Sequence, residues 1–383
     1  MNESMKVLHV INIGGYGGAE KLLLQLLPAL NQHSQTECWI AYQQANSEAA
    51  LRIAGELKSM GVAITTHAYN KVYEKGIFTA LQQKIAGGRY DLIHSHLKQA
   101  DFWLAVMKFR RRIDVPVVST MHSYTDRYEN KYGFNVTPKI YLTPYYQVTK
   151  WIYRQLDGFI LISDIVSRFF QQVSLLKGKK KAIIHHGYEQ KEILPVPLPP
   201  SQVRIALPGR LIRRKGHDYA IEAFGKIRKQ YPEATLHFYG MGVREEELKQ
   251  KVKEAGLQEH IIFEGYQHNL LAELQKASVI WMPSLWEAFG LVFLDGFAAG
   301  VPVVAFDLAA GNEIVQHEVN GLLATPYSAE DLAQQTLRLL ADPSLRERIV
   351  MGGRKALHEQ FNMEGMTRKY LDFYQQVIKA GHE

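Results

Sequence analysis

Cysteine and long apolar runs are the two features that this sequence of 383 residues most clearly lacks. Its one cysteine, Cys38, cannot form a disulfide within the chain, which suits a reducing compartment. No apolar run approaches the ~20 residues that a bilayer span needs. Residues 1–20 also lack the basic segment, apolar run and small-residue cleavage site of a signal peptide. We therefore expect a protein of the cytoplasm that does not span a membrane.

Signatures of metal and nucleic-acid sites are missing as well. The sequence has no HExxH pattern, no cysteine cluster and no Asp-x-Asp ahead of a loop, so we expect no metal site. It has no zinc-finger, RNA-recognition or helix-turn-helix signature, which argues against nucleic acid as a partner. Hydrophobic residues make up 46% and charged residues 22% of the chain, so disordered and fibrous classes are excluded too.

The net charge of +7 is unevenly distributed along the chain. Residues 1–200 carry 24 basic and 15 acidic side chains, a balance of +9, whereas residues 201–383 carry 21 and 23, a balance of −2. Residues 108–181 alone hold 14 basic and 5 acidic side chains. Such a local excess indicates an anionic partner, which composition alone leaves open between membrane lipid, phosphate and nucleic acid. We expect an anionic membrane surface contacted through residues 108–181, or an anionic acceptor, rather than nucleic acid.

Short β-rich runs alternate with amphipathic helical patterns along almost the whole chain. Several runs, such as VPVVS and VPVVA, are nearly all apolar, as in strands that are buried on both faces of a parallel sheet. The alternation therefore predicts an α/β protein. The predicted strands are residues 6–11, 36–42, 62–66, 91–94, 115–120, 158–162, 181–185, 203–207, 235–239, 260–263, 278–282, 301–305 and 321–324. The clearest helical patterns are residues 20–31, 218–230, 329–341 and 363–380.

A proline-rich segment divides the chain. Residues 189–201, EQKEILPVPLPPS, hold four of the 14 prolines, which lack an N–H donor and fix φ, so we expect an extended linker. It separates one Rossmann-like domain at residues 1–188 from a second at residues 202–360. We expect the two doubly wound sheets to face each other across a cleft that holds the ligand outside the carboxyl ends of the strands. The C-terminal helix, residues 361–383, is expected to pack back across the hinge toward the N-terminal domain.

The sequence GGYGGAE, residues 14–20, follows the first predicted strand and opens a helix. Glycine lets the backbone approach a ligand, and a helix N-terminus favours negative charge, so Gly15, Gly17 and Gly18 are candidate ligand-binding residues. The spacing is not GxGxxG, and no acidic residue ends the second strand, which argues against NAD. A turn whose glycines are required only for tight packing would explain the same pattern.

The sequence LPGRLIRRKGH, residues 207–217, follows the first strand of the second domain. A guanidinium at Arg210 and an ammonium at Lys215 could together hold a diphosphate, with Gly209 in the same loop. Arg213 and Arg214 compete for that role, although adjacent side chains diverge. A solvated basic turn is the alternative interpretation.

Two acidic residues lie in the apolar segment of residues 283–305. Glu287 falls in the loop after a predicted strand, and Asp295 lies about two turns along a helix that is expected to begin near Phe289. An acidic group ahead of a helix can be a simple N-cap. Asp295 within an apolar helix is costly unless something pairs with it, and ligand hydroxyls would be such a partner. The sequence GNEIV, residues 311–315, begins another helix whose N–H groups suit a phosphate, although a plain helix start explains it equally well.

Together these segments resemble a known enzyme family. The runs GRLxxxKG, PSxxEAFGLxxLDGFAAGVPVVA, GNEIV and NGLL, within residues 203–325, are similar to the nucleotide-sugar half of retaining glycosyltransferases of family 4 (glycosyl transferases group 1), which have the GT-B fold. The runs GGAE, HSH, MHS, LISD and HGYE, within residues 1–190, resemble that family's acceptor half more loosely. The resemblance covers essentially the whole chain and implies two Rossmann-like domains of the GT-B type.

The resemblance also implies roles for single residues. Arg210 and Lys215 would bind the donor diphosphate and stabilise the leaving group, and Glu287 would contact hydroxyls of the donor sugar. Asp295 stands where the family usually has a second Glu on the ribose, and it is one methylene shorter. His122 matches the family histidine that faces the donor sugar. The further donor-binding candidates are Gly209, Phe289, Gly290, Leu291, Val292 and Asn312, together with Gly15, Gly17 and Gly18.

The implied reaction moves a sugar from a nucleoside diphosphate sugar, with UDP favoured over GDP, to a cell-surface polysaccharide or a lipid-linked acceptor, with retention of configuration. No metal or other cofactor is implied, since positive side chains and helix N-termini do a metal's electrostatic work. Residues 123–156 hold seven tyrosines, Trp151 and five basic side chains. This pattern suits sugar stacking or a peripheral position on the inner face of the cytoplasmic membrane. An insertion packed on its own domain is the alternative.

Two other functions fit parts of the pattern. A sugar-nucleotide epimerase of the same fold would act without an acceptor, although the family 4 motifs argue against it. A non-catalytic basic binding module is disfavoured because Glu287 and the pair of Arg210 and Lys215 are all present. The sugar, the acceptor, the linkage and the oligomeric state stay open.

Overall fold

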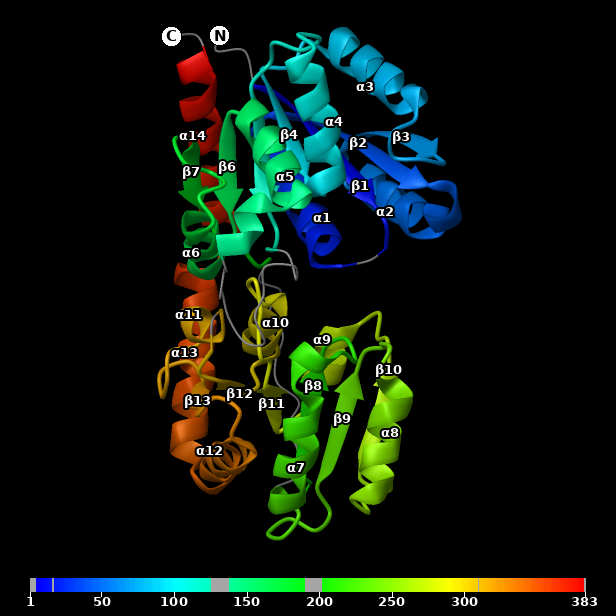
Figure 1. Ribbon diagram of the computed structural model, residues 1–383. Coiled ribbons are helices and arrows are strands. Elements are labelled where there is room, and N and C mark those ends of the chain that lie inside the picture. The colour runs from blue at the N-terminus through cyan, green and yellow to red at the C-terminus, as the bar shows by residue number, and fades with distance from the viewer. Residues whose placement is uncertain (1–4, 16, 125–137, 190–201, 309, 382–383) are drawn as a thin grey trace. The chain divides into compact units, whose positions relative to one another are not determined.

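The computed structural model describes most of the chain, namely residues 5–15, 17–124, 138–189, 202–308 and 310–381. The chain divides into two compact units, each built on one parallel sheet (Figure 1). Unit 1 comprises residues 1–187 and 363–383, and unit 2 comprises residues 188–362. Most of the predicted linker, residues 190–201, lies outside the described residues. Among the described residues, no helix has the length and apolar character that crossing a membrane requires.

Unit 1 contains a seven-stranded sheet in the order β3-β2-β1-β4-β5-β6-β7. Its strands are β1 (Lys6–Ile13), β2 (Gln35–Gln43), β3 (Ala63–Tyr69), β4 (Leu92–His96), β5 (Val117–Met121), β6 (Gly158–Leu161) and β7 (Lys180–Ile183). Its helices are α1 (Gly18–Asn31), α2 (Ser47–Ser59), α3 (Lys75–Gly88), α4 (Leu97–Phe109), α5 (Pro144–Gln155), α6 (Asp164–Gln172) and α14 (Met363–Gly381), with short 3-10 turns η1 (Gln44–Asn46) and η3 (Pro138–Leu142). The order of strands reverses between β1 and β4, the position at which ligands bind in open α/β sheets.

The last helix, α14, packs within unit 1. Its apolar side chains recur at helical spacing and form one stripe. They are buried against side chains of β1, β4, β5 and β6, and the cluster holds Val7, Leu22, Leu26, Leu30, Leu92, Val118, Ile160, Ile184, Met366, Tyr370, Phe373, Tyr374 and Val377. The segment after residue 362 is therefore a structural part of unit 1 (Figure 1).

Unit 2 contains a six-stranded sheet in the order β10-β9-β8-β11-β12-β13. Its strands are β8 (Arg204–Pro208), β9 (Thr235–Tyr239), β10 (Ile261–Gly265), β11 (Val279–Met282), β12 (Val303–Phe306) and β13 (Leu322–Ala324). Its helices are α7 (His217–Ile227), α8 (Glu245–Glu254), α9 (Leu270–Leu274), α10 (Leu291–Ala299), α11 (Gly311–Ile314), α12 (Ala329–Ala341) and α13 (Pro343–Glu359), with the 3-10 turn η4 (Arg213–Lys215). The fully buried Trp281 of β11 donates its indole N–H to Thr336 Oγ1 of α12 at 2.7 Å, which fixes this helix on the sheet.

The predicted fold class is confirmed. Each predicted strand occurs at its expected place, within a few residues at either end, and all the strand pairs are parallel. Helix α10 begins at Leu291, within two residues of the start expected near Phe289, and this small offset has a local cause. The reason is Gly290, whose φ of +91° places it outside the helix as its N-cap.

Gly216 joins two loops of unit 2 at the start of α7. Its φ of +73° lies in the left-handed region, and a Cβ atom there would lie 1.9 Å from the carbonyl oxygen of Pro283. Beside this contact, the amide of Leu285 donates to the carbonyl oxygen of Arg214 at 2.7 Å. The loop after β8 and the loop after β11 are therefore held together by their backbones.

The Gly216→Ala variant is expected to lower the free energy of unfolding by about 1–3 kcal/mol for the left-handed conformation alone, and by more because the methyl group meets Pro283. Gly225→Ala is the matched control. Gly225 lies inside α7 with open space around it, so alanine there should stabilise the protein by about 0.5–1 kcal/mol. Urea unfolding of both variants measures the difference. Equal stability of the two would contradict the close backbone approach.

Candidate functional site

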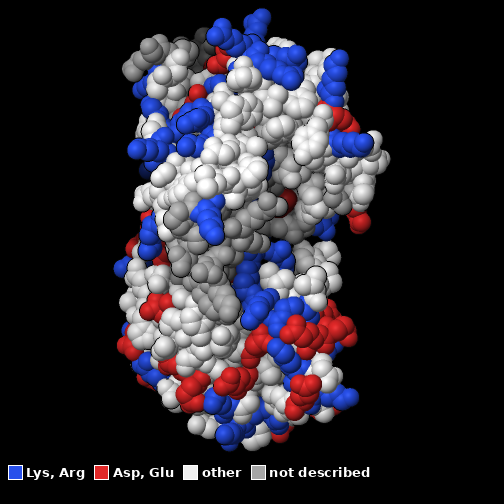
Figure 2. Space-filling model, viewed as in Figure 1, with Lys and Arg blue, Asp and Glu red and all other residues white. Residues whose placement is uncertain are grey.

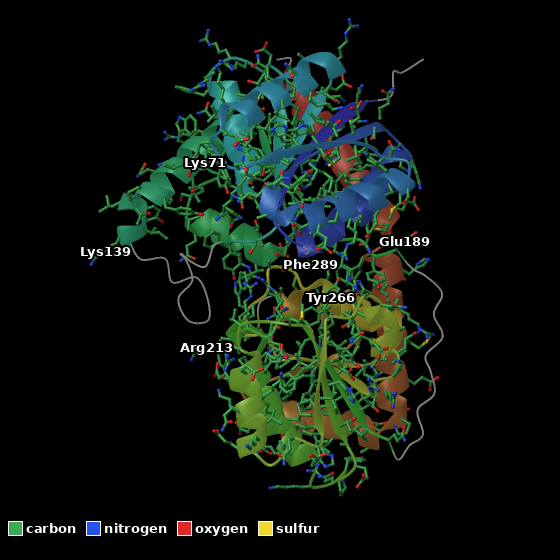
Figure 3. The ribbon with its side chains drawn as sticks, turned by 90° about the vertical axis from the view of Figure 1, so that its right-hand side faces the viewer. Lys71, Lys139, Glu189, Arg213, Tyr266 and Phe289 are labelled. Carbon is green, nitrogen blue, oxygen red and sulfur yellow. The ribbon has the colours of Figure 1, made fainter. Side chains whose placement is uncertain are left out.

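Two loops at the carboxyl edge of the unit 2 sheet carry most of the predicted site residues. Residues 209–216 follow β8, and residues 283–290 follow β11, its neighbour in the sheet. Neighbouring parallel strands end at the same edge, so the two loops lie side by side. Figure 3 labels Phe289 in the second loop and Tyr266, which follows β10 at the same edge.

Lys215 and Glu287 form the central contact between these loops. Lys215 Nζ donates to Glu287 Oε1, and the two side chains are only 11% and 12% exposed. Ser284 Oγ donates to the same carboxylate oxygen at 2.9 Å. Among the described residues, Glu287 Oε2 accepts no hydrogen bond, and the ammonium of Lys215 has two further donors. The protein thus fixes both groups and leaves them hydrogen-bonding capacity.

Arg210 lies in the same loop as Lys215. It is exposed, and its side chain makes no hydrogen bond or ion pair within the part of the chain that the structure describes. Of the two arginines predicted to compete with it, Arg214 stacks on Trp286, with its guanidinium carbon 4.5 Å from the ring centroid. Arg213 is exposed and extends outward from unit 2 in Figure 3. Gly209 lies against the stem of Lys215, where an added Cβ would be 3.3 Å from the Lys215 side chain.

The start of α10 supplies backbone donors to the same edge. Gly290 precedes the helix, and an added Cβ there would lie 2.7 Å from the ring of Phe293, so only glycine fits. The first N–H groups of a helix have no partner inside the helix. The amides of Leu291 and Val292 lie in this first turn, and phosphate binding by them stays a prediction.

Asp295 has a protein partner that the sequence did not reveal. It is 4% exposed, and its Oδ1 accepts a hydrogen bond from the hydroxyl of Tyr188 at 3.1 Å. Burial, and then the charge of Asp295, raise the pKa of Tyr188, so the phenol stays protonated and donates. The backbone of Tyr188 is anchored in turn, since its amide donates to the carbonyl oxygen of Phe361 at 2.7 Å. Tyr188 belongs to the HGYE run, but nothing in that run indicates a contact 107 positions away.

Asn312 does not offer the free amide that was expected. Its backbone N–H donates to the carbonyl oxygen of Leu308 at 3.0 Å, and its side-chain Nδ2 donates to Asp307 Oδ1 at 2.9 Å. Both donors are engaged within unit 2, because α11 is a helix of only four residues whose start folds back on the preceding loop. Donor binding by Asn312 stays a prediction, and it would require one of these hydrogen bonds to be exchanged for a bond to the ligand.

The glycine loop of unit 1 lies at the carboxyl end of β1. An added Cβ at Gly14, Gly15 or Gly18 would meet no atom within 4 Å, so packing does not require glycine at these positions. The amide of Gly17 donates to Glu20 Oε2 at 3.0 Å and caps the start of α1. Burial raises the pKa of Glu20. Among the described residues, tight packing therefore accounts for glycine at position 17, where an added Cβ would lie 3.1 Å from Glu20 Oε2, but not at positions 14, 15 and 18. Close approach of a ligand stays a prediction.

His122 follows β5 at the carboxyl edge of the unit 1 sheet and is half-buried. Its Nε2 lies 3.1 Å from Nδ1 of His96, which is fully buried on β4 together with His94. Burial lowers the pKa of His122 to about 4 and the pKa values of His94 and His96 well below their usual value. All three imidazoles are therefore neutral near pH 7.

Cations and exposed apolar side chains share one surface of unit 1. Phe109 at the end of α4 is 62% exposed and touches the ring of Trp151 on α5, with centroids 5.5 Å apart, and Val148 on the same helix is 52% exposed. The basic residues next to them in the sequence are Arg110, Arg111, Arg112, Lys150 and Arg154. Figure 2 shows Lys and Arg with few acidic neighbours over much of unit 1 and mixed charges over unit 2. We call Phe109, Val148, Trp151 and these cations the α4–α5 surface.

The packed-insertion alternative holds for part of the same region. Tyr146 and Tyr153 are buried, and Tyr146 donates its hydroxyl to the carbonyl oxygen of Val173. Residues 125–137 of the basic stretch, with Arg127 and Lys131, lie outside the described residues. The tyrosines of α5 therefore serve the fold, and the exposed part of the pattern is the α4–α5 surface.

Comparison with proteins of known sequence gives partial matches to named enzymes. An uncharacterized glycosyltransferase of Methanocaldococcus jannaschii is 33% identical over 168 residues, 43% of each chain. The lipopolysaccharide core biosynthesis glycosyltransferase LpsD of Rhizobium meliloti is 31% identical over 170 residues, 44% of this chain and 48% of that protein. The chain thus spans less than half the length of these relatives. The phosphatidyl-myo-inositol mannosyltransferase of Mycobacterium leprae is 23% identical over 376 residues, 95% of this chain and 94% of that one.

Comparison with solved structures extends over the whole fold. The crystal structure of Anabaena Alr3699/HepE in complex with UDP and glucose superposes with a TM-score of 0.78 at 18% identity, covering 97% of this chain and all of that chain. At this identity the likeness establishes the GT-B fold. Two family models divide the sequence between them: Glycosyltransferase Family 4 matches residues 16–192, and Glycosyl transferases group 1 matches residues 190–356. With both halves matched, the chain belongs to the group 1, family 4-type glycosyltransferases.

Proposed function

We propose that this chain transfers a sugar from a UDP-sugar to a cell-surface polysaccharide or a lipid-linked acceptor, with retention of configuration. One observation carries the proposal: Lys215 and Glu287 meet at the carboxyl edge of unit 2, in the loops beside Arg210 and the start of α10. The names of the relatives support it, since one acts in lipopolysaccharide core biosynthesis and another is a phosphatidyl-myo-inositol mannosyltransferase. A protein of the same fold binds UDP and glucose.

The donor diphosphate would bind to the positive groups at this edge. Charge develops on the diphosphate oxygen as the bond to the sugar breaks, and preorganised donors stabilise it. Lys215 is held for this role by Glu287 and keeps two of its three donors. The guanidinium of Arg210 has several N–H donors in a geometry that suits phosphate oxygens. The backbone amides of Leu291 and Val292, at the start of α10, would donate to the same diphosphate.

Glu287 would bind the sugar rather than attack it. Lys215 and Ser284 both hold Oε1, so the carboxylate is fixed and Oε2 can accept hydroxyls of the donor sugar. In the retaining reaction that we propose, the acceptor oxygen forms its bond to the anomeric carbon on the face from which the diphosphate leaves. The acceptor proton passes to an oxygen of the departing diphosphate. Such a reaction requires no covalent nucleophile and no metal ion.

Asp295 would bind the ribose. Tyr188 donates to Oδ1, and this anchored tyrosine compensates for the shorter side chain by fixing the direction of the carboxylate toward a ribose hydroxyl. His122 of unit 1 is the residue that the family resemblance assigns to the donor sugar. The α4–α5 surface, which combines the exposed apolar side chains of Phe109 and Val148 with cations, would contact an anionic membrane that carries the acceptor.

Lys215→Ala is expected to reduce kcat by about 10²–10³, because it removes one preorganised donor to the leaving diphosphate. Lys226→Ala is the control, since Lys226 of the same unit pairs with Glu330 on the surface. Release of UDP is measured with and without a glycan acceptor, because a sugar-nucleotide epimerase would need no acceptor. Near-normal activity of Lys215→Ala would refute the assignment, and acceptor-independent turnover would favour the epimerase.

UDP is expected to stabilise the wild-type protein against heat more than GDP or ADP at equal concentration, by about 2.7 kcal/mol at 100 times its dissociation constant. Asp295→Asn should weaken UDP binding by about 1.5–3 kcal/mol, because a hydrogen bond to a charged group is lost. A UDP analogue without ribose hydroxyls separates this role from a structural one. If Asp295→Asn lowers the affinity for UDP and for this analogue equally, Asp295 does not contact the ribose.

The protein is expected to co-sediment with vesicles rich in phosphatidylglycerol at low salt and to be released by salt, because screening weakens exposed charges. Phe109→Glu combined with Val148→Glu should abolish binding. Met351→Glu is the control, since Met351 of α13 is 57% exposed but belongs to unit 2. Absence of binding at low salt, or equal loss in the control, would contradict a membrane role for the α4–α5 surface.

A further inference from the structure

Four histidines gather on one face of the unit 1 sheet. His9 of β1 pairs in register with His94 of β4, and His96 pairs with Thr120 of β5. Paired residues of a parallel sheet, and residues two apart on a strand, point to the same face. The rings of His94 and His96 stack with centroids 4.1 Å apart, and the ring of His122, two residues after Thr120, lies 5.4 Å from that of His96.

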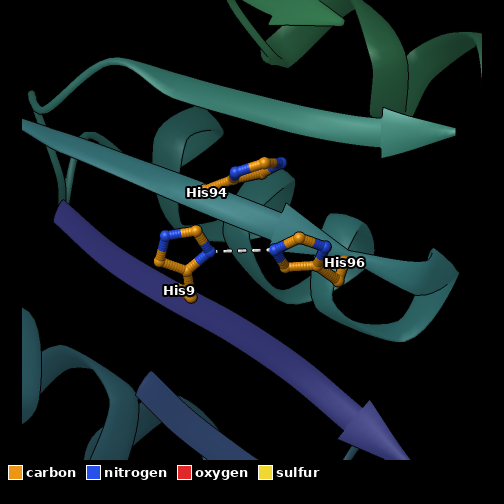
Figure 4. A group of neighbouring side chains, drawn as sticks. All are labelled: His9, His94 and His96. Atoms are coloured by element: carbon orange, nitrogen blue, oxygen red, sulfur yellow. Dashed lines mark hydrogen bonds between the residues drawn. The ribbon is translucent and has the colours of Figure 1, made fainter. Parts of the chain in front are cut away.

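Three of these rings form a continuous row. His9 Nδ1 lies 3.0 Å from His96 Nε2, the contact drawn in Figure 4, and His96 Nδ1 lies 3.1 Å from His122 Nε2. His9 and His96 are fully buried, whereas His122 is half-buried. The row thus runs from the core of the sheet to its carboxyl edge, and both ring nitrogens of His96 are used within it.

Each ring in the row carries a single ring proton near pH 7. Burial lowers the pKa of His9 to about 3 and that of His122 to about 4, and it lowers the pKa of His96 well below the usual value. A neutral imidazole has one N–H donor and one acceptor nitrogen. In a row of such rings every contact needs one donor, so the tautomer at one end determines all the others.

The buried end of the row determines which ring donates in each hydrogen bond. His9 Nε2 is buried and has no hydrogen-bond partner among the described residues. A proton on this nitrogen would be an orphaned N–H group, which is rare in protein interiors. The proton of His9 therefore belongs on Nδ1, which donates to His96 Nε2. His96 then donates from Nδ1 to His122 Nε2, and the proton of His122 lies on its own Nδ1.

We propose that His9 and His96 are positioning residues that fix the tautomer of His122, so that His122 presents Nδ1–H as a hydrogen-bond donor. Within the described residues Nδ1 of His122 has no hydrogen-bond partner, so it is open to a ligand. The proposal rests on the proposed function for the identity of that ligand, an oxygen of the donor sugar. In this tautomer His122 binds the sugar as a neutral donor and does not act as a general base.

A metal site is the other use that three clustered histidines suggest. One ligand atom each of His9, His94 and His96 lies within 4.8 Å of the others. However, both ring nitrogens of His94 already have partners, the hydroxyl of Tyr374 at 2.6 Å and Thr120 Oγ1 at 2.7 Å. His94 and His96 also stack face to face, whereas metal ligands direct their lone pairs at one point. The geometry favours the hydrogen-bonded row.

Nuclear magnetic resonance of protein with isotope-labelled histidine tests the proposal, because long-range proton–nitrogen spectra identify which ring nitrogen carries the proton. In the ligand-free wild type at pH 7 we expect His122 with its proton on Nδ1 and a bare Nε2. A proton on Nε2 of His122, or a charged ring, would overturn the proposal. The spectrum needs no sugar donor, so this failure is distinct from a failure of the proposed glycosyl transfer.

Three variants distinguish a positioning role of His9 toward His122 from a role in folding alone. His9→Phe removes the end of the row, and we expect a mixture of His122 tautomers and a loss of about tenfold in kcat/KM, equivalent to one hydrogen bond. His9→Asn can place an amide N–H near the position of Nδ1, and it should restore both the single His122 tautomer and the kcat/KM. His94→Gln is the control, since His94 is equally buried beside the row but not part of it, and the His122 tautomer should not change.

Three results would contradict the row. These are a single unchanged tautomer of His122 in His9→Phe, a change in His94→Gln as large as in His9→Phe, and stoichiometric zinc in the purified protein that requires His9. If His9→Phe does not fold, the wild-type spectrum alone decides which nitrogen of His122 is protonated.

Discussion

The contact between Lys215 and Glu287 is the interaction on which the carboxyl edge of unit 2 depends. Lys215 and Glu287 lie in different loops, which meet because β8 and β11 are neighbours. The approach of Gly216 to Pro283 sets the spacing of these loops, and the stacking of Arg214 on Trp286 reinforces it. Removing the carboxylate would leave a largely buried ammonium unpaired, which would lower the free energy of unfolding. The pair therefore holds the Lys215 ammonium in place between the two loops, next to Arg210.

The sequence was sufficient for the strands, because apolar runs and their spacing are local properties and parallel order follows from their alternation with helices. It was also sufficient for the two loops around Lys215 and Glu287, since loops after adjacent parallel strands share an edge. It could not reveal the hydrogen bond of Tyr188 to Asp295, which joins residues far apart in the chain and depends on packing. Nor could it show that the Asn312 amide is already used, since that depends on the geometry of a four-residue helix.

The uneven charge of the chain has different meanings in the two units. In unit 2 the charges of α7 and α8 largely neutralise one another: Asp218 pairs with both Arg244 and Lys251, and these cations lower its pKa. The positive groups of the loop after β8 are therefore a local feature that net charge does not reveal. In unit 1 the cations at the end of α4 and on α5 are neighbours in sequence of the exposed apolar side chains Phe109 and Val148. A charge excess is thus informative only after it has been assigned to a surface.

Buried polar groups in both units are held by tyrosines from the segments where the chain passes from one unit to the other. Asp295 is held by Tyr188, at the start of unit 2, and His94 is held by Tyr374 of α14, which follows the return to unit 1 at residue 363. An unpaired buried carboxylate or imidazole would destabilise its unit, so these hydroxyls are required by the fold. The same hydroxyls also fix the direction of groups at or next to the sites. The crossing segments therefore complete the polar interior of each unit, and without α14 the buried His94 would lose the hydroxyl of Tyr374 that pairs with its Nδ1.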